Sequence, residues 1–271
     1  MRSTFSALLV LALSLPGPWI TSISRSPSPC SSRFEGQDTV RPKKDFDTWK
    51  SFKISIKTRR EELKNDLIGD SSEKDKEVKS LIAIIDATLL DLDSMEMSCQ
   101  SYGLDHIKSM ESGSGWTDYD TGAKRIIIHY GPTANFIHES MHAWQFEKGD
   151  IGFRRDKGTP VAQDLSDEVA AYKAQFAYEP SGTFPSPAPG SLEGITEDWV
   201  HALKNSKGDS LYTLTGEAKT GIKKVNIDSS KSELIAAYPN TNFADALMRN
   251  TNPLYTIRSE RNAIIKTNPC K

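Results

Sequence analysis

Two histidines and a glutamate lie close together in the segment His138-Glu139-Ser140-Met141-His142. In a helix, positions four residues apart lie on the same face, so the imidazoles of His138 and His142 can reach one zinc ion. Glu139, one residue after the first histidine, would face a water molecule held by that ion. This spacing predicts the active-site helix of a zinc-dependent hydrolase.

The residue types suit hydrolysis. Neutral imidazole binds zinc and leaves the ion positive enough to lower the pKa of a bound water from ~15.7 toward ~7. A carboxylate beside that water can take its proton during attack on a carbonyl carbon and return it to the leaving amine. Two of only five histidines in 271 residues have this spacing. That favours a metal site over two unrelated surface histidines.

The residues around the motif predict a helix. Residues 133–146 contain neither Gly nor Pro. Thr133, which follows a proline, is expected to be the N-cap, and Gly149 is expected to end the helix. Met141 and Trp144 have the spacing that would bury one face of this helix against the rest of the domain.

A strand is predicted before this helix. Residues 125–130 form a β-branched run with a glycine on either side, which is typical of a strand. Residues 116–119 and the turn at 120–122 would supply the second arm of a hairpin. An exposed edge of this hairpin could align an extended peptide beside the metal through main-chain hydrogen bonds.

A catalytic zinc ion needs a third protein ligand and one open position. Glu168 is the best candidate, because it lies in the alanine-rich segment 164–176, which has high helix propensity. It borders a predicted buried face, where an unpaired carboxylate would be costly. That face is formed by Leu165, Val169, Tyr172 and Phe176. Asp164, Asp167 and His201 remain alternative ligands.

The pattern His138-Glu139-x-x-His142 followed by Glu168-x-x-Ala171-Tyr172 resembles the gluzincin branch of the zincin metallopeptidases. In that branch, two histidines and a glutamate from a second helix hold the zinc. The resemblance covers Trp116 to Tyr178 and implies a zincin-like α+β fold, rich in helices, with a small sheet next to the motif helix. The best-known gluzincins have an aspartate where this chain has Tyr172. It is therefore open which group orients the ligand histidines.

Two other zincin patterns fit less well. The metzincin type has a glycine three residues after the second histidine and a third histidine or aspartate three residues later. This chain has Gln145 and Lys148 at those positions. The aspzincin type has a Gly-Thr-x-Asp run, whereas residues 158–161 are Gly-Thr-Pro-Val. Glutamate is therefore the expected type of third ligand.

Three further residues have candidate roles. Tyr172 could donate a hydrogen bond to the oxyanion that forms during hydrolysis, although an aromatic residue at helical spacing more often belongs to the core. His201, in a predicted short helix, is a second candidate for stabilising the transition state. His129 lies in the predicted strand and is expected to be a structural imidazole.

The N-terminus predicts export. Arg2 precedes a short apolar run that ends at Pro16-Gly17-Pro18, which is typical of a signal peptide over residues 1–20. We therefore expect a secreted or periplasmic protein. The run is shorter than the ~20 apolar residues of a membrane span, and no other segment is long enough, so we expect no stable membrane insertion. The Ser- and Pro-rich residues 21–44 are predicted to be a disordered linker.

Residues 45–271 are expected to form one metallopeptidase domain with a helical part at 45–98, a zinc-site core at 114–180 and a C-terminal part at 191–271. Apolar stripes predict two helices in the first part. The first is expected to end at Gly69 and the second to be capped by Ser72. The C-terminal part is predicted to contain a hairpin around Gly216 and helices at 195–203, 232–237 and 242–248.

The overall charge of the chain limits the classes of molecule that it is expected to bind. The chain has 34 basic and 36 acidic residues and a formal net charge of -2, which indicates no nucleic acid or anionic membrane as partner.

Of its three cysteines, Cys99 and Cys270 are the expected disulfide pair, because Cys30 lies in the leader region.

We therefore expect a secreted metallopeptidase that binds one Zn²⁺ through His138, His142 and Glu168. Glu139 is expected to activate water for the hydrolysis of a peptide or protein substrate. The same ligands would also suit a zinc amidase acting on a non-protein amide. A zincin-like binding protein without catalytic activity is a third possibility, and the oligomeric state is left open.

Overall fold

The computed structural model describes residues 43–69, 72–98, 100–108, 115–205, 207–212, 224–238, 242–249 and 257–266. The predicted signal peptide, the three cysteines and the hairpin around Gly216 lie outside these residues. The predicted linker lies outside them as well, except for Lys43 and Lys44, which belong to the first helix. The described part combines helices with a small sheet, which confirms the α+β class.

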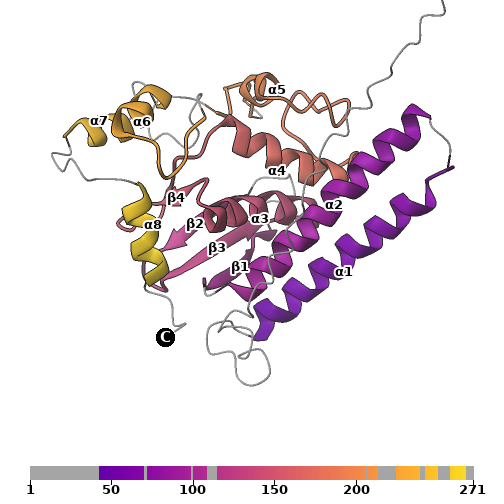
Figure 1. The fold of residues 1–271 in the computed structure, drawn as a ribbon, viewed down its shortest axis with the longest axis horizontal. Coiled ribbons are helices and arrows are strands. Elements are labelled where there is room, and N and C mark those ends of the chain that lie inside the picture. The colour runs from indigo at the N-terminus through magenta and orange to yellow at the C-terminus, as the bar shows by residue number, and fades with distance from the viewer. Residues whose placement is uncertain are drawn as a thin grey trace, which may run out of the picture.

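Helices α1 (Lys43–Asn65) and α2 (Glu73–Met97) pack against each other as a pair of long helices (Figure 1). Ser72 caps α2 as predicted, since its hydroxyl accepts a hydrogen bond from the Asp75 backbone N–H. The buried Asp75 carboxylate also accepts bonds from two backbone N–H groups of the connecting loop. The apolar stripes face inward, with Trp49, Ile56, Leu63, Val78, Leu81, Ile85, Leu89 and Leu92 all buried.

The main sheet has three strands in the order β1-β3-β2. β2 (Trp116–Asp120) and β3 (Arg125–Tyr130) form the predicted antiparallel hairpin. β1 (Tyr102–His106), which was not predicted, pairs with β3 in parallel. Side chains alternate between the two faces of a strand. Ile126 and Ile128 are buried on the face that packs against the next helix.

Helix α3 (Thr133–Lys148) lies across the sheet and carries the His-Glu-x-x-His motif (Figure 1). The prediction that Thr133 is the N-cap is wrong. Pro132 is the N-cap and Thr133 is the first helical residue, because the extended backbone of Pro132 lets its carbonyl accept the first helical hydrogen bond, from Phe136. The helix ends at Gly149 as predicted, with a φ of 86° that favours glycine.

Helix α4 (Leu165–Tyr178) packs against α3 and α2. It is preceded by the short strands β4 (Gly152–Phe153) and β5 (Pro160–Val161), which pair with each other. Asp164 caps α4 through a reciprocal arrangement with Asp167, in which each carboxylate accepts a bond from the other residue's backbone N–H. This cap fixes the first turn of α4, where Glu168 lies.

The C-terminal part is helical. α5 (Glu197–Ala202), α6 (Lys231–Ala237) and α7 (Asn242–Arg249) agree with the predicted helices to within a few residues. α8 (Ile257–Lys266) was not predicted. Its Arg261 donates hydrogen bonds to the backbone carbonyls of Phe146 and Glu147. Carbonyls at the C-terminal end of a helix such as α3 have no partner within the helix, so these bonds supply one. None of the helices in the described part of the chain is long and apolar enough to span a lipid bilayer.

His129 ties the three strands of the sheet together on the face away from α3. Its Nδ1 lies 2.8 Å from Asp105 Oδ2 on β1, and its Nε2 lies 3.3 Å from Asp118 Oδ1 on β2. The Trp116 ring stacks on the imidazole with centroids 4.3 Å apart. Burial lowers the pKa of His129, but the two carboxylates raise it by more, so the pKa lies above its ordinary value. The imidazole is therefore structural, as expected.

The raised pKa predicts that His129 stabilises the fold more at low pH. The pKa of this histidine in the unfolded chain is about 6.5. The stabilisation that protonated His129 gives to the folded state is therefore complete below that pH, and it is lost as the pH rises through the pKa of the folded state. The substitution His129→Gln should therefore lower the free energy of unfolding by more at about pH 5.5 than at about pH 8.5. Chemical denaturation of both proteins measures this difference, with His201→Gln as a control for losing an exposed imidazole. An equal loss at both pH values would contradict the prediction.

Candidate metal centre

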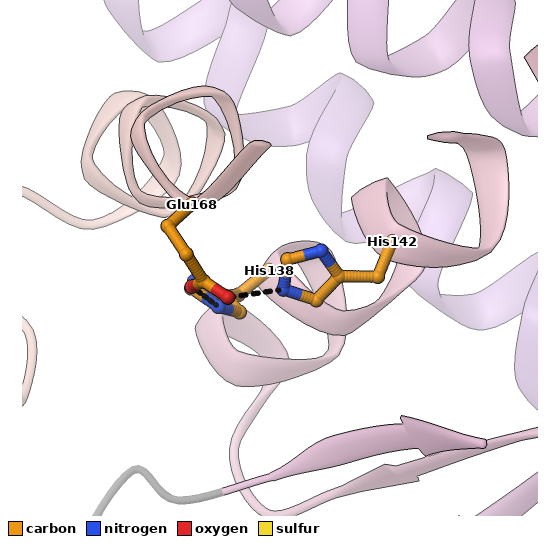
Figure 2. Close-up of side chains that lie close together, drawn as sticks. All are labelled: His138, His142 and Glu168. Carbon is orange, nitrogen blue, oxygen red and sulfur yellow. Dashed lines mark ion pairs between the residues drawn. The ribbon is translucent and has the colours of Figure 1, made fainter. Parts of the chain in front are cut away.

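Two adjacent helices bring three potential metal ligands together. His138 and His142 lie on α3 and Glu168 lies on α4, and all three side chains are buried. Figure 2 shows the Glu168 carboxylate facing both imidazoles. His138 Nε2 lies 3.5 Å from Glu168 Oε2, and His142 Nε2 lies 3.5 Å from Glu168 Oε1. One ligand atom from each residue lies within 4.8 Å of the others, so the group could hold one metal ion.

The spacing fits a metal better than direct hydrogen bonds. Hydrogen bonds between nitrogen and oxygen are about 2.7–3.2 Å long, so separations of 3.5 Å are too long for good ones. In a tetrahedral zinc site with ligand distances of about 2.0–2.2 Å, neighbouring ligand atoms lie about 3.3–3.6 Å apart. Imidazole nitrogens select transition metals such as zinc over calcium or magnesium. The donor types are therefore compatible with a transition-metal ion such as zinc, and the three side chains lie close enough to hold one ion.

His142 is oriented by Gln145, which answers for this histidine the question left open by the absence of an aspartate at position 172. Gln145 Nε2 donates to the Asp167 carbonyl over 2.8 Å. Because a carbonyl only accepts, the amide oxygen of Gln145 must face the other way, toward His142 Nδ1 at 2.8 Å. Nδ1 must then carry the proton, and Nε2 presents its lone pair toward Glu168. The Nδ1 atom of His138, by contrast, is buried and has no hydrogen-bond partner among the described residues.

We expect Gln145→Leu to raise the dissociation constant for zinc by about 10- to 100-fold, because His142 would lose the bond that fixes its tautomer. Gln175→Leu is the matched control. Gln175 is also a buried helical glutamine that donates to a backbone carbonyl, that of Thr183. Competition with a chromophoric chelator measures both constants. Equal constants in the two variants would contradict the assigned role of Gln145.

The Glu168 carboxylate has two further partners. Gln163 Nε2 lies 2.7 Å from Oε1, and the Tyr212 hydroxyl donates to Oε2 over 2.6 Å. Burial raises the pKa of Glu168, but the attraction of His142 and His138 and the bond from Tyr212 lower it by more. Burial and the charge of Glu168 raise the pKa of Tyr212 well above its ordinary value, which keeps its hydroxyl protonated. Sequence reasoning missed both partners.

Glu139 is buried beside the three ligands. The Thr117 hydroxyl lies 2.8 Å from the Glu139 carbonyl oxygen and 3.2 Å from Oε2, so strand β2 contacts this residue directly. Burial raises the pKa of Glu139 to about 7, with an added contribution from the charge of Glu168. Sequence reasoning missed Thr117, although the alternation along β2 places it on the face toward α3.

The alternative ligands lie elsewhere. Both Asp164 and Asp167 carboxylates cap α4, and Asp164 Oδ2 also accepts a bond from the Val225 backbone N–H. Burial and the neighbouring Asp164 raise the pKa of Asp167 to about 8. His201 is exposed on α5. Within the described ranges, the metal-compatible group contains none of these three residues.

Tyr172 lies next to the group on α4, one turn after Glu168. Its ring packs edge-on against the His138 imidazole, with centroids 4.4 Å apart, and its hydroxyl lies 3.0 Å from that of Tyr212. The side chain is also part of the hydrophobic core. The structure thus brings Tyr172 to the candidate site and leaves His201 at the surface.

The comparisons with protein-family models, curated proteins and solved structures found no match. The buried group and its spacing are compatible with a zincin-like site. One fold can support many functions, so the chemistry of these side chains is what bears on the function.

Proposed function

We propose that this chain is a zinc-dependent metallopeptidase of the gluzincin type. His138, His142 and Glu168 hold one zinc ion, and Glu139 is the general base. One observation carries the proposal: two buried imidazoles surround one buried carboxylate at ligand spacing, and a second buried carboxylate follows the first histidine. Four buried titratable side chains in one place are costly to a fold unless they bind a cation or react.

The chain's own residues would move the proton. Bound zinc would supply Lewis acidity, both to the attacking water and to the carbonyl of the scissile bond. Glu139 would accept a proton as the water oxygen bonds to the carbonyl carbon, and would pass it to the amine nitrogen as the C–N bond breaks. The single hydroxyl hydrogen of Thr117 lies between the Glu139 carbonyl oxygen at 2.8 Å and its Oε2 at 3.2 Å, so this contact keeps Glu139 against strand β2.

Strand β2 supports the choice of a peptide as substrate. It is an edge strand of the sheet, and Thr117 places it beside the general base. An extended peptide could add to this edge through main-chain hydrogen bonds. At Tyr119 the edge is occupied, because the Tyr119 backbone N–H donates to the Gly158 carbonyl over 2.9 Å. A substrate would therefore pair with the preceding part of β2, around Thr117.

A mixed peptide library tests the proposal. Zinc-loaded wild-type protein should cleave internal or terminal peptide bonds that Glu139→Gln leaves intact, as read by mass spectrometry of the products. If both proteins retain zinc and neither cleaves any peptide, the peptidase assignment fails. Hydrolysis of a non-protein amide in the same assay would then favour the amidase alternative. The predicted signal peptide would place the substrates outside the cytosol.

A further inference from the structure

The Glu168 carboxylate is held at both oxygens by side chains that come from outside α4. Gln163 lies in the loop before the helix. Its Nε2 is 2.7 Å from Oε1, and it also lies 3.3 and 3.4 Å from the two ring nitrogens of His142. Tyr212, which follows α5, is 2.6 Å from Oε2. An ionised carboxylate only accepts hydrogen bonds, so both partners must donate to it. Together the two bonds fix the rotation of the carboxylate plane as well as its position.

A third hydroxyl supports one of these bonds. Tyr212 has a single hydroxyl hydrogen and uses it for Glu168. In the 3.0 Å contact between the Tyr172 and Tyr212 hydroxyls, Tyr172 must therefore be the donor. The bonds run in one direction, from Tyr172 to Tyr212 to Glu168. The Tyr172 ring is itself fixed edge-on between His138 and Trp199.

The backbone before α4 is held in a costly conformation that delivers Gln163 to this position. Ala162 is buried and has a φ of 61°, in the left-handed region that residues other than glycine rarely adopt. The next residue is anchored at its backbone too, since the Tyr238 hydroxyl donates to the Gln163 carbonyl. Such strain persists only where the surroundings impose it, and it concentrates at binding and catalytic sites.

We propose that Gln163 and Tyr212 form a carboxylate clamp that holds Glu168 in its metal-binding orientation, with Tyr172 acting through Tyr212. The inference rests on the proposed function, because it requires Glu168 to be a metal ligand. All three are positioning residues. A ligand that is oriented before the metal arrives loses less conformational freedom on binding, so the clamp should raise metal affinity.

The zinc dissociation constant of the full chain, measured by competition with a chromophoric chelator, tests the clamp without relying on activity. Tyr212→Phe and Gln163→Leu each remove one hydrogen-bond donor and should each raise the constant by about 10- to 100-fold. Tyr178→Phe is the matched control, because it removes the hydroxyl of a half-buried tyrosine at the far end of α4. It should leave the constant unchanged.

A double-mutant cycle separates the clamp from a general structural role. Tyr172→Phe alone should raise the zinc dissociation constant, by less than Tyr212→Phe does. In the Tyr212→Phe background, the same substitution should have no further effect, because its path to Glu168 is already broken. A general loosening of the core would instead give additive effects and would contradict the chain of bonds through Tyr212.

The outcomes distinguish the clamp from the metal site. If Tyr212→Phe and Gln163→Leu bind zinc as tightly as the wild type while Glu168→Ala does not bind it, the clamp is wrong and the metal site stands. If the wild-type protein binds no zinc, the proposed function fails and the clamp fails with it. Circular dichroism of each metal-free variant checks that the compared proteins are folded.

Discussion

Replacing Glu139 with glutamine is expected to lower kcat for peptide hydrolysis by about 10²- to 10⁴-fold, the range that a general base contributes. Glutamine has nearly the same shape, and the contact of Thr117 with the backbone carbonyl of residue 139 is unaffected by the substitution. It cannot accept the proton of the attacking water. Zinc should remain bound, because His138, His142 and Glu168 are unchanged. Steady-state kinetics and the metal content of the same sample give both results.

Glu147→Gln provides the matched control for this variant. Glu147 is also a glutamate of α3, but its carboxylate accepts hydrogen bonds from Ser98 and Tyr102 and is not part of the metal-compatible group. This control should retain the wild-type kcat even if its stability falls. An unchanged kcat in Glu139→Gln, or an equal loss in Glu147→Gln, would remove Glu139 from the role of general base.

Replacing Glu168 with alanine is expected to weaken zinc binding by more than about 100-fold, since even the hydrogen-bond partners of a ligand contribute about 10- to 100-fold. Two imidazoles then remain, which is one ligand fewer than a catalytic zinc site uses. Zinc content after dialysis measures the loss directly. Excess zinc should raise the free energy of unfolding of the wild type, because it binds the folded state, and should have little effect on this variant.

Asp167→Asn is the control for Glu168→Ala. Asp167 is the neighbouring buried carboxyl, and its side chain accepts the Asp164 backbone N–H at the start of α4. Asparagine keeps an acceptor for that bond, so the cap should survive and zinc should stay bound. Loss of zinc from Asp167→Asn together with full retention in Glu168→Ala would show that the third ligand had been assigned to the wrong carboxylate.

The parts of the fold that were predicted are those with a local signal. The apolar stripes of α1 and α2, the β-branched run of β3 and the spacing within the His-Glu-x-x-His motif all depend on residues near one another in sequence. Glu168 could be predicted as a ligand because it borders the apolar face of its own helix, where burying an unpaired carboxylate is costly. The N-cap of α3 was nevertheless predicted one residue too late, because Pro132, with its extended backbone and its carbonyl, is the cap.

The rest of the site depends on contacts between distant residues. β1 is stabilised by parallel pairing with β3, which its own sequence, Tyr-Gly-Leu-Asp-His, does not signal. Tyr212 reaches Glu168 across 44 residues. Gln163 reaches it from a loop in which Ala162 adopts a left-handed backbone conformation that its residue type does not signal. Gln145 is the exception. It lies three residues after His142 on the same helix, so its contact could have been inferred from spacing.

The central claim is that His138, His142 and Glu168 hold one zinc ion, and diffraction from zinc-loaded crystals at the zinc absorption edge tests it most directly. We predict one anomalous peak per chain, within about 2.0–2.2 Å of His138 Nε2, His142 Nε2 and a Glu168 carboxylate oxygen. A zinc peak bound by other residues, or no peak between these three side chains at saturating zinc, would contradict the account.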